Sequence, residues 1–204
     1  ILERTNGIFS EIIKDRNGNL WIGAFHEGAI LLNFDQPVIH NYDLPEIKEK
    51  LGLSPNIMTL YEDKDGLLWF NQNRYGFGTY DPSTGQTKFL NDSRVFEEKG
   101  IESISCVIDY TPGSTDTSEA NIWIGVGYRD LIYMLRKDGS NLKIVDKIDL
   151  YELFPGIGHP VLFYADKRNN IWVGTMKGLL VKPYDSSEIR MFNPYTGCFL
   201  LYPS

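Results

Sequence analysis

The side chains that could do nucleophilic or acid–base chemistry are scattered through this sequence and form no catalytic motif. The three histidines, His26, His40 and His159, have no serine or cysteine nucleophile near them in a recognisable pattern. The 27 aspartates and glutamates offer many carboxylate pairs, but no spacing selects one pair for hydrolysis of a glycosidic bond. The sequence therefore predicts a protein that is not an enzyme and uses no cofactor.

The Asp-x-x-Gly turns come closest to a metal-binding pattern. A calcium loop needs oxygen ligands at its first, third and fifth positions and a bidentate glutamate further on. Only Asp63 and Asp65 keep part of that spacing, and Leu67 stands at the next ligand position. We therefore expect structural turns at these places and no bound metal.

Four tryptophans reveal an internal repeat. Trp21, Trp69, Trp123 and Trp172 follow one another at intervals of 48, 54 and 49 residues. Each stands inside a short apolar run, which favours packing between strands over the stacking of a sugar on the indole. We therefore expect structural tryptophans, each at the same place in one of four repeats.

An aspartate marks the turn before each tryptophan. Asp15, Asp63 and Asp166 precede theirs by six residues, and a glycine follows in the first two of these turns. The aspartate side chain can cap the amides of such a turn, while glycine accepts a positive φ without steric cost. In the third repeat we assign Asp109 to this position, 14 residues before Trp123, with a longer loop between them.

Strand patterns recur around these anchors. In the second repeat they are 57–62, the run through Trp69, 77–80 and 86–90, with polar turns between them. Four short strands in about 50 residues, repeated along the chain, are typical of β-propeller blades. We therefore expect an all-β chain that forms a single β-propeller segment of four four-stranded blades. The predicted blades are residues 1–44, 53–92, 101–150 and 157–204.

Two features of this propeller stay open in the sequence. The four blades form either an arc of a larger propeller or a closed four-bladed ring. After Glu188, a second turn at 193–197 adds either an extra hairpin or an interruption of the third strand. The only helical pattern, at 45–51, lies between two blades.

Charge and hydropathy exclude several classes of partner. The formal net charge is −7 and no run of Lys and Arg occurs, which argues against nucleic acid and direct membrane contact. The apolar runs are far shorter than the roughly 20 residues of a membrane-spanning helix. Cys106 and Cys198 fit no zinc or redox spacing, and we expect no disulfide between them. Because the chain begins at Ile1 without a methionine, we expect a piece of a longer protein.

The repeats resemble those of the two-component regulator propeller family, whose consensus is Asp-x-x-Gly-x-Leu-Trp-Ile-Gly-Thr followed by Gly-Leu. Residues 15–23 read Asp-Arg-Asn-Gly-Asn-Leu-Trp-Ile-Gly, and residues 170–175 read Asn-Ile-Trp-Val-Gly-Thr before Gly178 and Leu179. The resemblance covers essentially the whole chain. Asn71 departs from it in the second repeat and Asn169 in the fourth.

This resemblance implies a sensor. Such repeats form the periplasmic part of hybrid two-component histidine kinases that are anchored in the inner membrane, and their ligand is typically an oligosaccharide. The remaining propeller blades and the kinase would then lie outside this chain, and a second copy is a further expected partner. Because the family builds propellers of more than four blades, the resemblance favours the arc over the closed ring.

Candidate ligand-binding residues lie where the loops vary while the scaffold repeats. The fifth residue after each tryptophan is polar or aromatic, and so are several of its neighbours. In a propeller these loops share one face with the segments that lead into the first strands, and variable side chains on a rigid face suit recognition. The predicted ligand-binding residues are His26, Arg74, Tyr75, Tyr128, Arg129, His159 and Lys177.

Two other functions compete with a sensor. A propeller lyase or hydrolase would need histidines, glutamates or a metal clustered at the channel of a complete ring, which three histidines in four repeats disfavour. A scaffold that binds another protein is the third alternative, and no sequence feature here separates it from the sensor.

Overall fold

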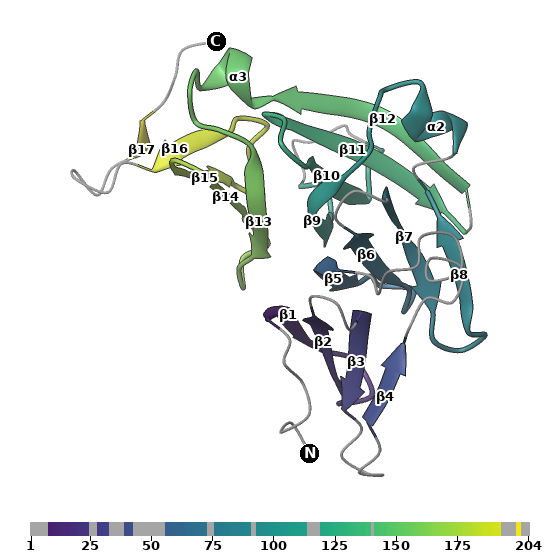
Figure 1. The fold of residues 1–204 in the computed structure, drawn as a ribbon. Coiled ribbons are helices and arrows are strands. Elements are labelled where there is room, and N and C mark those ends of the chain that lie inside the picture. The colour runs from purple at the N-terminus through teal and green to yellow at the C-terminus, as the bar shows by residue number, and fades with distance from the viewer. Residues whose placement is uncertain are drawn as a thin grey trace. The chain divides into compact units, whose positions relative to one another are not determined.

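The computed structural model describes residues 8–24, 28–32, 39–42, 56–72, 76–90, 93–113, 119–139, 141–192 and 199–200. The chain divides into two compact units, residues 1–103 and 104–204. Each unit holds two antiparallel sheets (Figure 1). The predicted helix at 45–51 lies outside the described residues.

The first unit contains two four-stranded sheets in which each strand pairs with the next along the chain. The first sheet consists of β1 (Phe9–Lys14), β2 (Leu20–Ala24), β3 (Gly28–Leu32) and β4 (Ile39–Tyr42). The second consists of β5 (Ile57–Glu62), β6 (Leu68–Gln72), β7 (Gly76–Asp81) and β8 (Gln86–Phe89). A short helix that the sequence did not predict, α2 (Arg94–Glu97), follows and buries Phe96.

The second unit repeats this order with one addition. The third sheet consists of β9 (Ile104–Asp109), β10 (Ile122–Val126), β11 (Leu131–Asp138) and β12 (Asn141–Asp149). The fourth consists of β13 (Pro160–Ala165), β14 (Ile171–Thr175), β15 (Leu179–Lys182), β16 (Arg190–Phe192) and β17 (Phe199–Leu200). A second unpredicted helix, α3 (Leu150–Leu153), joins the two sheets. The fifth strand decides the point left open after Glu188, because the fourth repeat carries an extra strand beside β16.

A β-bulge stands at the same place in the first strand of every sheet. The strand pairing skips Ser10, Met58, Ser105 and Val161 in turn. A bulge leaves one residue outside the ladder and turns its side chain toward new partners. The freed hydroxyl of Ser10 donates to the carbonyl of Ile57 at 2.5 Å, and that of Ser105 donates to the carbonyl of Pro160 at 2.5 Å. These bonds tie the first sheet to the second and the third sheet to the fourth.

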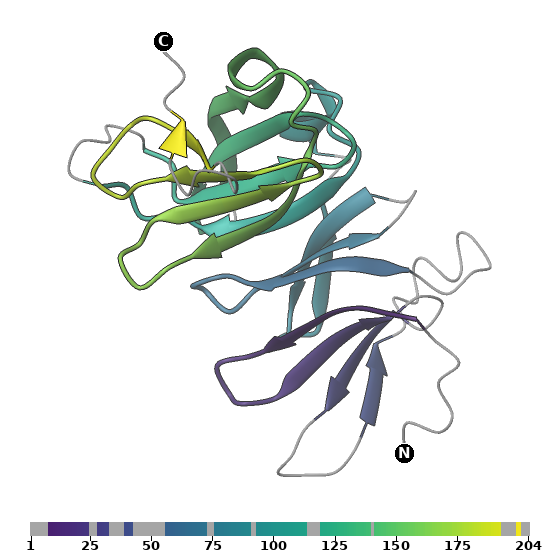
Figure 2. The ribbon, with the colours of Figure 1, turned by 90° about the vertical axis from the view of Figure 1, so that its left-hand side faces the viewer.

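Each unit is held together by the tryptophan of one sheet packing on the next sheet. Trp21 lies in a buried cluster with Ile57, Leu60 and Phe70 of the second sheet, and its ring meets Tyr80 edge-on at 6.2 Å. Figure 2 shows the ribbon of the first sheet beside that of the second sheet. In the second unit, Trp123 meets Phe163 of the fourth sheet at 6.4 Å. Within each unit, two sheets stack face to face in sequence order, one repeat to each sheet, as the blades of a β-propeller do. The chain therefore has the predicted all-β propeller fold with four blades.

Candidate functional site

In each of the first, second and fourth blades, one aspartate carboxylate accepts hydrogen bonds from both the turn and the tryptophan. Asp15 accepts the indole N–H of Trp21 at 3.0 Å, and Asp63 accepts that of Trp69 at 2.8 Å. Asp166 does the same for Trp172 at 3.0 Å. The other oxygen of each carboxylate accepts backbone amides two and four residues further along the chain. Both oxygens of each aspartate accept hydrogen bonds within the scaffold, so these turns are structural.

These hydrogen bonds stabilise the charged form of two of the aspartates. The bonds from Trp172 and Asn170 hold the pKa of Asp166 at about 2, below the usual 3.8. For Asp15, burial by itself would raise the pKa, but the bonds from Asn19, Trp21 and the turn amides outweigh it and lower the pKa. Carboxylates held ionised in this way are poor general acids.

The third blade departs from this arrangement, and the assignment of Asp109 was wrong by one residue. The amides of Asp15, Asp63 and Asp166 donate across the turn to the carbonyls of residues 19, 67 and 170. In the third blade it is the amide of Tyr110 that makes this bond, to Asn121, whereas Asp109 pairs with Ile122 inside the ladder. Tyr110 therefore occupies the aspartate position. Its ring stacks on Trp123 with centroids 4.6 Å apart.

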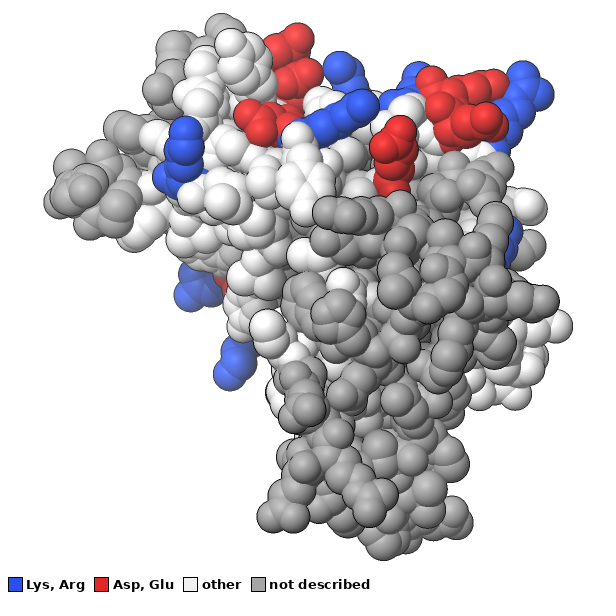
Figure 3. Space-filling view, viewed as in Figure 1, with Lys and Arg blue, Asp and Glu red and all other residues white. Residues whose placement is uncertain are grey.

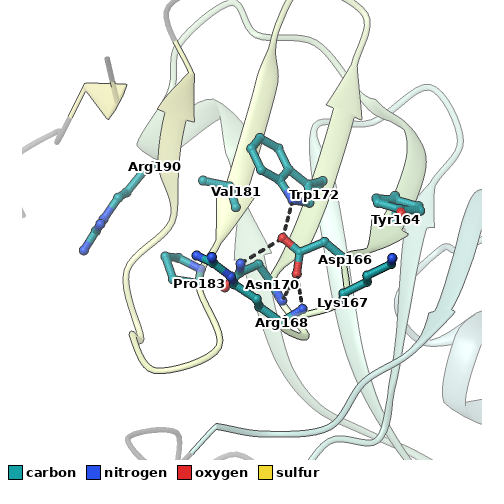
Figure 4. Close-up of a pocket in the computed structure, with 9 residues that line it drawn as sticks. All are labelled: Tyr164, Asp166, Lys167, Arg168, Asn170, Trp172, Val181, Pro183 and Arg190. Atoms are coloured by element: carbon teal, nitrogen blue, oxygen red, sulfur yellow. Dashed lines mark hydrogen bonds between the residues drawn. The ribbon is translucent and has the colours of Figure 1, made fainter. Parts of the chain in front are cut away.

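Three of the four tryptophans are buried, and the fourth is partly exposed. Trp21, Trp69 and Trp123 are at most 2% exposed, as expected for side chains that pack between blades. Trp172 has the same place on its strand and the same bond to an aspartate, yet solvent reaches it. It lines an open pocket of about 510 Å³ on the fourth blade (Figure 4). The pocket is lined by Tyr164, Asp166, Lys167, Arg168, Asn170, Trp172, Val181, Pro183 and Arg190.

The second unit brings two of the predicted ligand-binding residues together. Tyr128 lies in the turn between β10 and β11, and His159 stands immediately before β13. Their ring centroids are 5.7 Å apart, with the planes tilted by 53°. The carbonyl of His159 accepts the amide of Met176 at 3.2 Å, which fixes the histidine segment against the loop after β14. The amide of Lys177 in the same loop donates to Ile157 at 3.1 Å.

Tyr128 holds a backbone conformation that a tyrosine rarely adopts. Its φ is +61°, in the left-handed region that favours glycine, and its side chain is 71% exposed. Such a conformation costs about 1–2 kcal/mol for a residue with a side chain. The strain presents a large ring to solvent beside His159, where a glycine would satisfy the turn at lower cost. A strained, exposed aromatic residue is the kind of outlier that points to a binding role.

The remaining predicted ligand-binding residues are divided between the loops. Arg129 and Lys177 are exposed in the second unit, and the amide of Arg129 closes the Tyr128 turn by donating to Val126 at 3.4 Å. His26, Arg74 and Tyr75 lie outside the described residues. The structure therefore places Tyr128, Arg129, His159 and Lys177 in neighbouring loops of one unit, and their role in binding stays a prediction.

Sequence reasoning missed Gln72 at the end of β6. It is 0% exposed, and neither its amide nitrogen nor its amide oxygen has a hydrogen-bond partner among the described residues. The equivalent residues of the other blades are Ala24, Val126 and Thr175, of which only Thr175 is polar, and it bonds to its own loop. A buried amide without partners costs about 1–3 kcal/mol. The sequence did carry a signal for this position, because the second repeat alone reads Trp-Phe-Asn-Gln where the others have glycine after the apolar residue.

The described residues contain no group of three or more histidine, cysteine, aspartate or glutamate side chains that could hold a metal ion. Among them there is also no helix long and apolar enough to cross a membrane. On the face drawn in Figure 3, the Asp and Glu side chains lie mainly along the upper edge of the view, among Lys and Arg side chains, and most of the remaining described surface is uncharged.

The chain matches no family model and no curated protein, but it is similar to several solved structures. One is the extracellular domain of the putative one component system BT4673 from B. thetaiotaomicron, with a TM-score of 0.63 and 19% identity over 91% of this chain. A second is the extracellular domain of the putative hybrid two component system BT3049 from the same organism, with a TM-score of 0.57 and 19% identity over 96% of this chain. The Dos1 propeller follows with a TM-score of 0.52, 16% identity and coverage of 97% of this chain and 49% of its own.

These likenesses establish the fold. The chain spans 23% of the length of the BT4673 domain and 23% of the BT3049 domain. Its four blades thus correspond to part of each of those domains. The likeness of the structures agrees with the propeller fold expected from the repeats.

Proposed function

We propose that this chain is a ligand-binding segment of a periplasmic sensor domain. Its ligand is an oligosaccharide, and binding is signalled to a histidine kinase that lies outside these 204 residues. The proposal draws on the likeness to extracellular domains of putative one- and two-component systems. It also draws on the repeat pattern of the sequence.

The pair formed by Tyr128 and His159 carries the proposal. An exposed tyrosine ring offers a flat apolar surface with a polar end, which suits the C–H face and the hydroxyls of a sugar. His159 lies beside that ring, and the imidazole can donate to or accept from a hydroxyl. Both residues stand in loops on the edges of a rigid sheet pair, the usual place for a recognition site.

Charged donors around this pair fit a sugar ligand. Arg129 follows Tyr128 directly, and its guanidinium offers a planar fork of donors to neighbouring hydroxyls or to a carboxylate. The exposed Lys177 adds a further positive charge in the adjacent loop. Both carboxylate oxygens of Asp15, Asp63 and Asp166 accept hydrogen bonds within the repeated turns, so these turns serve the scaffold.

Calorimetric titration of the gene product that contains this chain tests the proposal. Short neutral and uronic-acid oligosaccharides of glucose, xylose and galactose are titrated into the native protein and into the separate variants Arg74→Ala and Arg129→Ala. Losing one charge-assisted contact is expected to weaken binding by roughly 1.5–3 kcal/mol. Circular dichroism verifies the folding of each variant. Unchanged affinity in both folded variants would place the site on other blades and leave this segment as scaffold.

A further inference from the structure

Three short segments between strands form one face of the second unit. We call it the Tyr128 face and define it by the turn 127–130, the segment 154–159 that leads into β13, and the loop 176–178 after β14. Tyr128 and His159 join the first two segments, with ring centroids 5.7 Å apart. Because all three segments belong to the second unit, the geometry of the face is set within residues 104–204.

Hydrogen bonds fasten the segment before β13 to the loop after β14. The amide of Met176 donates to the carbonyl of His159 at 3.2 Å, and the amide of Lys177 donates to the carbonyl of Ile157 at 3.1 Å. The hydroxyl of Thr175 donates to that same carbonyl of Ile157 at 3.0 Å. The backbone of Lys177 is therefore held beside the segment that carries His159.

Two glycines allow these segments to approach so closely. The φ of Gly158 is +80°, and a Cβ atom there would lie 2.9 Å from Cβ of Met176. A Cβ atom on Gly178 would lie 2.5 Å from Cδ1 of Ile157. Since the backbone of the face is fixed in this way before a ligand arrives, binding has few groups left to order and loses little entropy.

Positive charge gathers on the Tyr128 face. Arg129 and Lys177 are exposed, and within the described residues neither forms an ion pair with a carboxylate. Asp130 is the only carboxylate in the sequence of the three segments. Four other arginines, by contrast, lie 2.6–3.9 Å from a carboxylate oxygen, and these are Arg16, Arg94, Arg136 and Arg190.

These local charges oppose the charge of the whole chain. The formal net charge is −7, which by itself repels an anion. At physiological ionic strength, however, exposed charges act only over a distance of about 8 Å, so a bound ligand interacts mainly with the side chains next to it. Next to Tyr128 and His159 those side chains include two cations that lack a counter-charge.

We propose that the Tyr128 face binds an acidic oligosaccharide, whose carboxylate or sulfate group supplies the counter-charge for Arg129 and Lys177 while a sugar ring lies on Tyr128. This inference rests on the proposed function and narrows its ligand class. A guanidinium donates in parallel to two oxygens of one acid group, and such charge-assisted bonds are about twice as strong as neutral ones. A neutral sugar would leave both cations without that partner.

The test uses two matched pairs of ligands. Trigalacturonic acid is compared with its trimethyl ester, and a sulfated galactose trisaccharide is compared with its desulfated form. Each is titrated by calorimetry into the gene product that contains this chain. The acidic member of at least one pair should bind tenfold or more tightly than its neutral partner, and raised NaCl should shrink the difference. The pair that shows the difference tells carboxylate from sulfate recognition.

Three variants show whether the preference comes from the Tyr128 face. Arg129→Gln and Lys177→Gln should each weaken binding of the acidic member about tenfold and leave that of its neutral partner unchanged. Lys143→Gln is the matched control, because it removes the same charge from an exposed residue of β12 in the same unit. It should leave both affinities unchanged. Circular dichroism verifies that all three variants fold.

Two kinds of result would overturn this inference and leave the proposed function standing. One is a neutral member that binds as tightly as its acidic partner in both pairs. The other is an acidic preference that persists in both Arg129→Gln and Lys177→Gln, or that Lys143→Gln reduces equally. If none of the four sugars binds the folded native protein, the proposed function fails and this inference fails with it.

Discussion

The ring of Tyr110 stacks on the indole of Trp123, with centroids 4.6 Å apart and planes inclined by 29°. In the other three blades an aspartate fills this position and accepts the indole N–H. The buried N–H of Trp123 has no acceptor within the part of the chain that the structure describes, so the third blade exchanges a hydrogen bond for aromatic packing. The ammonium of Lys182 lies 5.4 Å from the centroid of the Tyr110 ring and adds a cation–π contact from the fourth blade.

Burial of the tryptophans predicts unequal losses of stability. Trp69→Ala should lower the free energy of unfolding by about 3–5 kcal/mol, because a fully buried indole leaves a cavity. Trp172→Ala should cost clearly less, since Trp172 is already partly exposed. Urea denaturation followed by far-UV circular dichroism measures both changes. Equal losses would mean that Trp172 is as well packed as Trp69.

Local sequence signals were sufficient to predict the strands but not all of their neighbours. The apolar alternation and the Asp-Gly turns placed the first strands and the tryptophan strands, because both signals act within a few residues. The insertion before Trp123 hid the register of the third blade, and only the strand pairing identified Tyr110 in place of Asp109. The exposure of Trp172 was not predictable from its repeat, because it depends on what packs over the fourth blade.

The candidate site was predictable only as a set of loops. Because loops between equivalent strands share one edge of a propeller, the sequence placed Tyr128 and His159 on the same face. Their ring centroids lie 5.7 Å apart, but the two residues belong to different blades, and so no local sequence pattern predicts the contact. The sequence also did not predict the strain at Tyr128. Its turn contains a glycine, Gly127, that would be expected to take the positive φ instead.

Replacing Tyr128 with glycine is expected to stabilise the fold and weaken ligand binding at the same time. Tyr128→Gly should raise the free energy of unfolding by about 1 kcal/mol, because glycine adopts a φ of +61° without the steric cost. The same variant should weaken oligosaccharide binding, because the ring is lost. Tyr128→Ala is the matched control, since it removes the ring but keeps the strain. Thermal unfolding and calorimetry should show weaker binding in both variants and a gain of stability only with glycine. Binding that survives both changes would remove Tyr128 from the site.

A variant of the buried Gln72 is also expected to change stability and binding in opposite directions. Gln72→Leu should raise the free energy of unfolding by about 1–3 kcal/mol, because it removes a buried amide that has no partner. Gln72 directly precedes the loop with Arg74 and Tyr75, so we expect the same variant to weaken oligosaccharide binding. Gln72→Thr is the control, because the equivalent Thr175 satisfies its hydroxyl on Ile157 and Gly178. Greater stability with unchanged affinity would assign Gln72 no role in recognition.

The depressed pKa of Asp166 predicts how one part of the stability depends on pH. The bonds from Trp172 and Asn170 lower the pKa in the folded chain to about 2, from a usual value of 3.8. The ionised carboxylate therefore stabilises the fold fully above about pH 4, and this contribution is lost as the pH falls through about 2. Asp166→Asn removes the titrating group but keeps one acceptor for the indole. The difference in unfolding temperature between the native chain and Asp166→Asn should thus be constant from pH 7 to pH 5 and shrink steadily below pH 4. A difference that grows on acidification would show that the charge of Asp166 destabilises the fold, contrary to the hydrogen bonds it accepts.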